Sequence, residues 1–96
     1  MFYINVLLTA HNVDDVSELQ ELLTQCATLS RAEPGCVRFE VYHSQTDEKV
    51  FLLNEHWESK EAWEVHRQAE AVTTIYVPKV LPRVQRVPHF CTLVEG

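Results

Sequence analysis

The order of two side-chain periodicities along the chain predicts an α+β fold, with a four-stranded antiparallel sheet and helices on one of its faces. Apolar and polar residues alternate in four short segments, as in strands that bury one face. Apolar residues recur every three or four positions in two other segments, as on helices that bury one stripe. In chain order the elements are strand, helix, strand, strand, helix, strand, and residues 1–96 are expected to form one domain.

The first strand and the first helix occupy the N-terminal third of the chain. Residues 2–9 alternate, and their even-numbered positions are apolar. Helical spacing follows over residues 11–30, where Asn12 or Asp14 can cap the first turn. The Pro-Gly pair beyond this segment ends the helix, since both residues disfavour its continuation.

Two further strands are expected to form a hairpin. Residues 36–43 and 50–57 both alternate, and a short polar segment joins them. In the first of these strands Val37, Phe39 and Val41 fall on the same side. We therefore predict that these three side chains face the core.

The last third of the chain should hold a helix and an edge strand. Ser59 is a good N-cap for a helix from about residue 60 to 71. The next stretch is expected to form one or two helical turns broken by Pro78 and Pro82. Residues 86–94 read as a fourth strand at the sheet edge, because the proline within it cannot donate to a ladder. The element order is the split βαβ, or ferredoxin-like, pattern.

Composition excludes several classes of protein. A formal charge of −6 disfavours nucleic-acid binding, which requires clustered Lys and Arg. No apolar stretch approaches the roughly 20 residues of a membrane span, and no basic leader precedes the first strand. The chain has three cysteines, an odd number, and none of them are in C-x-x-C spacing. We therefore expect reduced thiols and a cytoplasmic protein. With only two glycines, a glycine-rich loop for a nucleotide cofactor is absent.

Both faces of the third strand are apolar, which predicts a homodimer. Val50 and Leu52 lie on the face opposite Phe51 and Leu53. Helices can cover only one face of the sheet. A second copy of the chain, packed sheet to sheet, is the expected cover for the other.

The segment NEHWESKEAWEVH, residues 54–66, holds the candidate site. Alternation places Glu55 and Trp57 on one face of the strand and His56 on the other, while His66 lies near the buried stripe of the following helix. The sequence H-x-E followed by a later His resembles the motif of iron sites with two histidine ligands and one carboxylate ligand. Because these side chains fall on two faces, we expect no metal site.

Glu55, Trp57 and His66 can be read as core residues or as a pocket. A tryptophan is often plain core, and a lone histidine is often a hydrogen-bonded core residue. A carboxylate beneath a helix, however, needs a partner, water or a ligand. A Glu–His pair would stabilise the charged form of both groups.

The stretch SRAEPGCVRFEVYHSQTDEKVFLLNEHWESKEAWEVH resembles the antibiotic biosynthesis monooxygenase-like domain family. The shared features are E-P-G-C at 33–36, Glu55 and Trp57 on the third strand, and His66 on the next helix. The resemblance implies a ferredoxin-like α+β homodimer with a pocket between sheet and helices. Relatives include cofactor-independent oxygenases of polycyclic phenols and quinols, an isomerase of a phosphorylated signalling sugar, and haem-degrading enzymes.

The chain departs from parts of the family pattern. Some aromatic-polyketide oxygenases of the family carry Asn where this chain has Leu53, and Asn54 lies on the opposite face. Haem-degrading relatives place Trp at the position of His66 and a haem-ligating His near the position of Tyr76. Both differences argue against haem.

The resemblance and the residues together predict a cofactor-independent monooxygenase that oxidises a small phenol or quinol with dioxygen. Such an enzyme must supply a base, a dry pocket and donors for a peroxy intermediate. His66 is the expected base, and Glu55 orients it or holds its imidazolium. No cofactor or metal is expected. The expected substrate-binding residues are Leu53, Trp57, Trp63 and Tyr76.

Two alternative functions stay open at this point. An isomerase or tautomerase would use the same Glu–His pair to move a proton beside a carbonyl. If its substrate were phosphorylated, Lys79, Arg83 and Arg86 form the available basic cluster. A non-catalytic dimeric ligand-binding module would use the same pocket only for binding.

Overall fold

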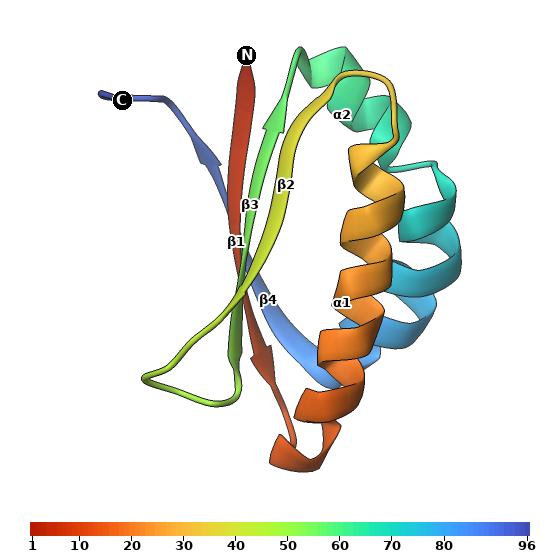
Figure 1. The fold of residues 1–96 in the computed structure, drawn as a ribbon, viewed down its shortest axis with the longest axis vertical. Helices are drawn as coiled ribbons and strands as arrows, with labels where there is room; N and C mark the ends of the chain where they lie inside the picture. Colours follow the sequence, from red (N-terminus) through yellow and green to blue (C-terminus); the bar gives the residue numbers. More distant parts are fainter.

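An antiparallel sheet and a layer of helices against one of its faces form two layers, as Figure 1 shows. The computed structural model describes every residue from 1 to 96. The predicted ferredoxin-like α+β order of elements is confirmed. The elements are β1 (Phe2–Ala10), η1 (Val13–Asp15), α1 (Val16–Arg31), β2 (Cys36–His43), β3 (Val50–Trp57), α2 (Lys60–His66), η2 (Ala71–Val80), η3 (Leu81–Arg83) and β4 (Val84–Cys91).

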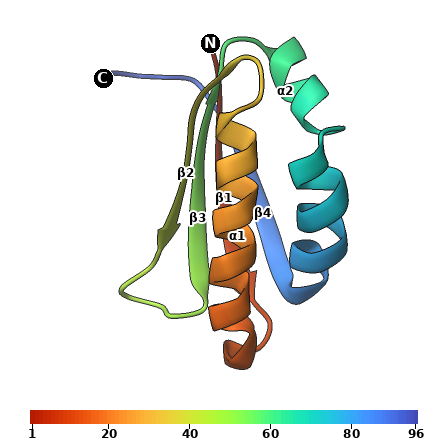
Figure 2. The ribbon, with the colours of Figure 1, turned by 45° about the vertical axis from the view of Figure 1, so that its right-hand side comes forward.

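The sheet has the strand order β2-β3-β1-β4, and every neighbouring pair is antiparallel. The predicted hairpin of β2 and β3 is confirmed, and β4 pairs only with β1. β4 is therefore an edge strand, as its proline predicts. Figure 2 shows α1 and η2 on the same side of the sheet, where α1 packs against both β2 and η2.

The core lies between the sheet and the helices. The even-numbered positions of β1 from Ile4 to Ala10 are buried, as the alternation predicts. From α1 the apolar stripe that includes Leu19 and Leu23 is buried against them. Asn12 caps the short η1 helix that leads into α1, and its side chain accepts a hydrogen bond from the Asp14 amide.

The predicted inward position of Val37 is wrong. In the register of β2 and β3, Cys36 lies opposite Trp57 and Arg38 lies opposite His56, so Val37 is an extra residue in a β-bulge. Its side chain is 52% exposed, whereas Phe39 beyond the bulge is buried. Simple alternation cannot show a bulge, because the bulge itself shifts the alternation by one residue.

The helices after β3 also differ from the prediction. The helix expected to reach residue 71 ends at His66, and the segment Ala71–Val80 forms one π-helix with Pro78 inside it. In an α-helix a proline ring clashes with the carbonyl four residues earlier. The i→i+5 hydrogen bonds of a π-helix place that carbonyl differently, so Pro78 does not break η2. β4 begins at Val84, two residues earlier than predicted, and ends at Cys91, three residues earlier than predicted.

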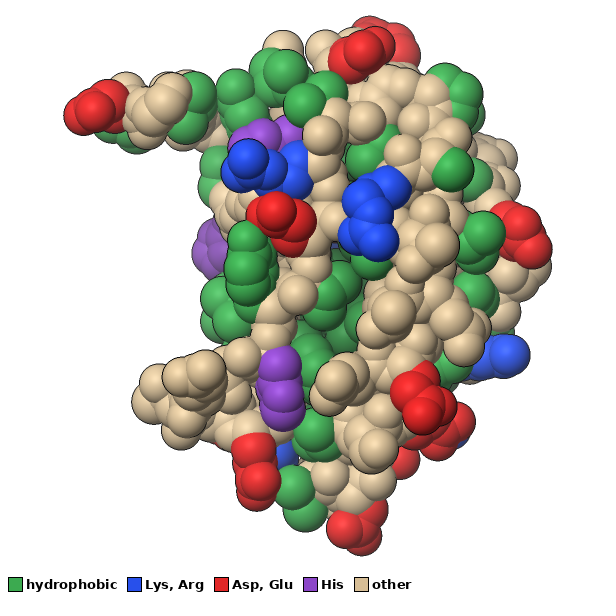
Figure 3. Space-filling view, in the orientation of Figure 1, with side chains coloured by type: hydrophobic (Ala, Val, Ile, Leu, Met, Phe, Trp, Pro, Cys, Tyr) green, Lys and Arg blue, Asp and Glu red, His purple; other side chains and the backbone are tan.

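The sheet face away from the helices carries one apolar residue from each strand, in a single row. The register pairs Tyr42 with Leu52, Leu52 with Leu7, and Leu7 with Val87. Their exposed fractions lie between 37% and 51%. Hydrophobic side chains are visible on this left-hand side of Figure 3, where the C-terminal segment also projects from the molecule. No helix combines the length and the apolar character needed to cross a membrane.

Candidate functional site

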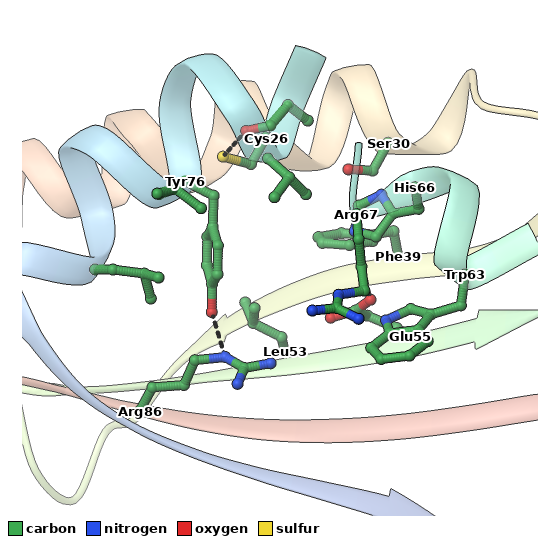
Figure 4. A pocket seen from close by; sticks show the side chains of 14 residues that line it. Cys26, Ser30, Phe39, Leu53, Glu55, Trp63, His66, Arg67, Tyr76 and Arg86 are labelled. Atoms are coloured by element: carbon green, nitrogen blue, oxygen red, sulfur yellow. Dashed lines mark hydrogen bonds and ion pairs between the residues drawn. The ribbon is translucent and has the colours of Figure 1, made fainter. Parts of the chain in front are cut away.

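A cavity of about 240 Å³ lies between the sheet and the helices. Its buried residues come mainly from β2, β3, α1 and the end of α2, and its exposed residues are Arg67 directly after α2, Val77 of η2 and Arg86 of β4. Figure 4 shows its side chains converging from these elements. The fourteen lining residues are Cys26, Ser30, Phe39, Leu53, Glu55, Trp63, His66, Arg67, Ala71, Val72, Tyr76, Val77, Leu81 and Arg86.

His66 is held by a carboxylate from another part of the chain. Its Nδ1 lies 2.7 Å from Oε1 of Glu33, which precedes β2, and the two side chains are only 7% and 14% exposed. Its Nε2 lies 3.9 Å from Oε1 of Glu55, a distance too long for a hydrogen bond. Trp57 packs against the imidazole with ring centroids 4.4 Å apart. The His66 ring is thus fixed on its Nδ1 side, and its Nε2 side faces Glu55.

The turn before β2 explains how Glu33 reaches His66. Gly35 has φ +81°, a left-handed conformation that other residues adopt only with strain. A Cβ atom at Gly35 would lie 2.6 Å from the Cβ of Ala62 on α2. The Gly35 carbonyl accepts a hydrogen bond of 2.8 Å from the Glu58 amide. Glycine therefore lets the turn lie directly against the start of α2, the helix that ends at His66.

Glu55 is a buried carboxyl group on the cavity floor. Its Oε1 accepts a hydrogen bond of 3.1 Å from the indole Nε1 of Trp57. Burial raises the pKa of Glu55, while that hydrogen bond and the nearby His66 and Arg86 oppose the increase. Glu55 therefore holds its proton more tightly than an exposed glutamate does.

Tyr76 and Arg86 form a second polar pair in the cavity. Nε of Arg86 donates to the Tyr76 hydroxyl at 3.0 Å, and Figure 4 marks this contact. Burial raises the pKa of Tyr76 to about 12, so its phenol stays protonated at neutral pH. At the rim, the guanidinium of Arg67 lies 5.0 Å from the centroid of the Trp63 ring.

A family model describes the larger part of this sequence. The antibiotic biosynthesis monooxygenase model matches residues 1–76, which run from β1 into η2. The chain belongs to the antibiotic biosynthesis monooxygenase family. No curated protein matches it significantly.

Solved structures share the fold of this family member at low sequence identity. A crystal structure described as an antibiotic biosynthesis monooxygenase has a TM-score of 0.90 and 18% identity over 99% of this chain and 100% of its own. A Pseudomonas aeruginosa protein has a TM-score of 0.89 and 20% identity over 98% and 94%. SnoaB from Streptomyces nogalater, described as a cofactor-independent oxygenase, has a TM-score of 0.86 and 12% identity over 99% and 94%.

Most of the residues expected to form the site meet in the cavity of this monooxygenase-family chain. Its lining includes Glu55 and His66, and also Leu53, Trp63 and Tyr76. The fully buried Trp57 lies outside the lining. Its indole supports Glu55 and His66 from within the core instead of lying open to a ligand.

Sequence reasoning missed three features of the site. In the sequence Glu33 stands out only as part of the E-P-G-C motif, yet it makes the short contact to His66 that the predicted Glu–His pair assigns to Glu55. Arg67 carries no motif, and its place directly after His66 is the one signal in the sequence that it lies near the site. Ser30 is buried in the lining, and its i+4 spacing from Cys26 on the helix stripe could have indicated this.

Two other groups of residues contribute little to the cavity. His56 lies on the face away from the cavity, where it makes an edge-to-face contact with Tyr3, and the structure has no cluster of three His, Cys, Asp or Glu side chains able to hold a metal. Of the basic cluster near the C-terminus, only Arg86 reaches the cavity. Arg83 instead pairs with Glu18 at 3.1 Å.

Proposed function

We propose that this protein is a cofactor-independent monooxygenase that oxidises a small phenol or quinol with dioxygen. The observation that carries the proposal is the His66 side chain, held at Nδ1 by Glu33 and directed by Nε2 into an otherwise largely apolar cavity. The likeness to SnoaB supports the same reaction class through the fold.

The Glu33 contact gives His66 the tautomer of a general base. A carboxylate oxygen 2.7 Å from Nδ1 accepts the proton on that nitrogen, which leaves a lone pair on Nε2. The same carboxylate stabilises the imidazolium that forms when Nε2 accepts a proton, as in other carboxylate–histidine pairs. Nε2 can therefore remove the hydroxyl proton of a bound phenol.

The substrate itself can supply the electrons for the reaction. The phenolate transfers electrons to dioxygen, and a bond forms between one oxygen atom and the ring carbon opposite the hydroxyl group. When the O–O bond of this peroxide breaks, one oxygen stays on the ring as a carbonyl and the other leaves as water. Water takes the former O–H and C–H hydrogens, so a phenol and dioxygen give a quinone and water without an external reductant.

The cavity suits such a reaction in size and polarity. A dry cavity of about 150 Å³ can hold benzene, so about 240 Å³ admits one or two rings with substituents. Sites for drug-sized ligands usually span about 300–1,000 Å³, and this cavity has little room for a substrate beside an organic cofactor. The protonated Tyr76 hydroxyl, fixed by Arg86, can donate a hydrogen bond to the peroxide.

We also propose that two copies of the chain pack through their bare sheet faces. The row formed by Tyr42, Leu52, Leu7 and Val87 crosses all four strands. A twofold axis through the sheet centre would place this row against its own copy, as an isologous interface requires. Burial of these half-exposed side chains provides the hydrophobic contribution.

An isomerase that moves a proton is the second candidate. The observation that favours it is the pair of His66 and Glu55, in which Nε2 and Oε1 are 3.9 Å apart. Burial raises the pKa of Glu55, which favours the protonated form that such an enzyme would use to donate a proton. Such an enzyme would act on an enol or ketone and would consume no oxygen.

Oxygen consumption with a panel of quinols and phenols tests the proposal. We expect His66→Gln to lower the rate about 10²–10⁴-fold, because general-base catalysis typically contributes that much. The matched control is His11→Gln, since His11 is exposed and lies outside the cavity. An unchanged rate per folded molecule in His66→Gln would contradict the role of His66. Turnover of an enol without oxygen uptake would favour the isomerase, and ligand binding without any turnover would favour a binding module.

A further inference from the structure

The cavity lining has an excess of positive charge, although the chain as a whole is acidic. The sequence has eight Lys and Arg against fourteen Asp and Glu. Arg67 and Arg86 both line the cavity, and Glu55 is the one acidic residue in the lining. Neither arginine forms a salt bridge. A cavity with this charge attracts an anionic ligand more strongly than a neutral one.

The two arginines lie where a ligand enters. Both side chains are exposed, while the floor residues are buried, so the guanidinium groups mark the rim. Arg86 uses Nε to donate to Tyr76, which orients the side chain and leaves its two NH₂ groups without a protein acceptor. Arg67 is placed by its contact with the Trp63 ring. A planar guanidinium with two free donor groups matches the two oxygens of a carboxylate.

Ser30 provides an unpartnered hydroxyl group at the buried side of the cavity. The residue is 0% exposed, lines the cavity and has no hydrogen-bond partner for its Oγ. Serine and threonine within helices often donate to the carbonyl four residues earlier. Thr24 and Thr28 on the same helix do so, at 2.7 and 3.0 Å. The Ser30 hydroxyl is therefore available to a ligand oxygen.

Figure 4 shows how these groups are distributed around the cavity. Ser30 on α1 and His66 at the end of α2 lie at the same end, while Tyr76 and Arg86 lie at the other. In the arrangement proposed below, a ligand hydroxyl group at this end would give its proton to His66 and accept a hydrogen bond from Ser30. An anionic group on the same molecule then points toward Arg86. In the view of Figure 4 the Arg67 guanidinium lies between the two ends, near Trp63.

We propose that the cavity binds a small aromatic hydroxy acid, with its carboxylate at Arg86 and Arg67 and its hydroxyl oxygen at Ser30. This assignment rests on the proposed function only in taking the cavity as the substrate site. In this arrangement the arginines select the acid, and Ser30 is a specificity-determining residue that stabilises the phenolate formed by His66.

Isothermal titration calorimetry with three matched compounds tests the assignment without requiring turnover. The first, 6-hydroxy-2-naphthoate, carries both groups at opposite ends of two rings. The second, 2-naphthoate, lacks the hydroxyl group, and the third, 2-naphthol, lacks the carboxylate. We expect the hydroxy acid to bind tightest, with 2-naphthol weaker by roughly 10–100-fold, as for loss of a charge-assisted hydrogen bond.

Substitutions identify which side chain binds which group of the ligand. Arg86→Gln and Arg67→Gln should each weaken binding of the hydroxy acid roughly tenfold and leave 2-naphthol unchanged. Lys79→Gln is the control for net charge, because Lys79 is exposed on η2 and outside the lining. Ser30→Ala should weaken the hydroxy acid roughly threefold to tenfold, leave 2-naphthoate unchanged, and raise the melting temperature of the free protein. The opposite signs of these two effects separate a ligand contact from a structural role.

Three results would overturn the assignment. One is equal affinity for the hydroxy acid and 2-naphthol, and another is an equal loss for both compounds in Arg86→Gln and Arg67→Gln. The third is the absence of measurable binding of the hydroxy acid to the unaltered protein. Selective binding of the acid without oxygen uptake from any phenol would leave this assignment in place and refute the oxygenase proposal instead.

Discussion

Replacement of Gly35 by alanine should destabilise the protein strongly, for two separable reasons. The left-handed backbone, with φ +81°, costs a non-glycine residue about 1–2 kcal/mol. The new Cβ would also lie 2.6 Å from the Cβ of Ala62, and overpacking of this kind costs about 1–3 kcal/mol. Together these contributions predict a loss of about 2–5 kcal/mol in the free energy of unfolding. That is a large part of the roughly 5–15 kcal/mol that stabilises a small domain.

Urea unfolding followed by tryptophan fluorescence measures the effect. We expect the midpoint for Gly35→Ala to fall by about 1–3 M with an unchanged slope. The double variant Gly35→Ala/Ala62→Gly removes the overlap and retains the backbone strain, so it should recover part of the loss. A midpoint equal to that of the unaltered protein, or a double variant no more stable than the single one, would refute the reasoning.

The same substitution should also disturb the candidate site. Gly35 follows Glu33 by two residues, and Ala62 precedes His66 by one helical turn. If the clash separates the turn from α2, it lengthens the 2.7 Å contact between Glu33 and His66. We therefore expect activity per folded molecule to fall in Gly35→Ala and to return in the double variant, on any substrate found.

Three further substitutions test the site and the assembly. Glu33→Gln keeps a hydrogen-bond acceptor for Nδ1 of His66 but removes the negative charge of the acceptor. Turnover should fall about tenfold, because a hydrogen bond to a charged group is stronger than a neutral one by about 1.4 kcal/mol. Full activity would contradict the role of the Glu33–His66 contact. The raised pKa of Glu55 means that the native state loses stability as pH rises from the ordinary carboxyl pKa through the raised one. The melting temperature of Glu55→Gln relative to the unaltered protein should therefore increase as the pH rises above the ordinary carboxyl pKa, and a difference that does not change with pH would argue against it. Leu52→Asp should convert a dimer into monomers in light scattering or unfold it, whereas Val13→Asp at another exposed site should not; a monomeric unaltered protein would refute the dimer.

The elements that the sequence predicts correctly are those whose burial follows a simple period. Alternation in β1 and β3 gives the right faces, including Glu55 beneath the helices and His56 outside. Alternation places Val37 on the wrong face because a bulge inserts one residue without any change in composition. Local patterns report which face a residue occupies, and they do so only while the backbone keeps one geometry.

The contacts that make the site depend on long-range geometry. Glu33 and His66 are 33 residues apart, and their contact depends on how a glycine turn lies against α2. Their presence in one family motif indicated proximity to the site, but not which carboxylate holds the histidine. Arg86 comes from an edge strand, and alternation cannot predict its bond to Tyr76 across the cavity.

The π-helical geometry of η2 has a consequence for how this cavity can change in evolution. Its lining residues Val72 and Val77, and likewise Tyr76 and Leu81, are five positions apart, and the Leu81 amide bonds to the Tyr76 carbonyl. Deletion of one residue from this segment would let i→i+4 pairing replace i→i+5 pairing at that turn, and the side chains of the turn would change their direction toward the cavity. The deletion would replace several lining residues in one event, without any substitution. Family members with different ligands are therefore expected to differ in the length of this segment as well as in its residues.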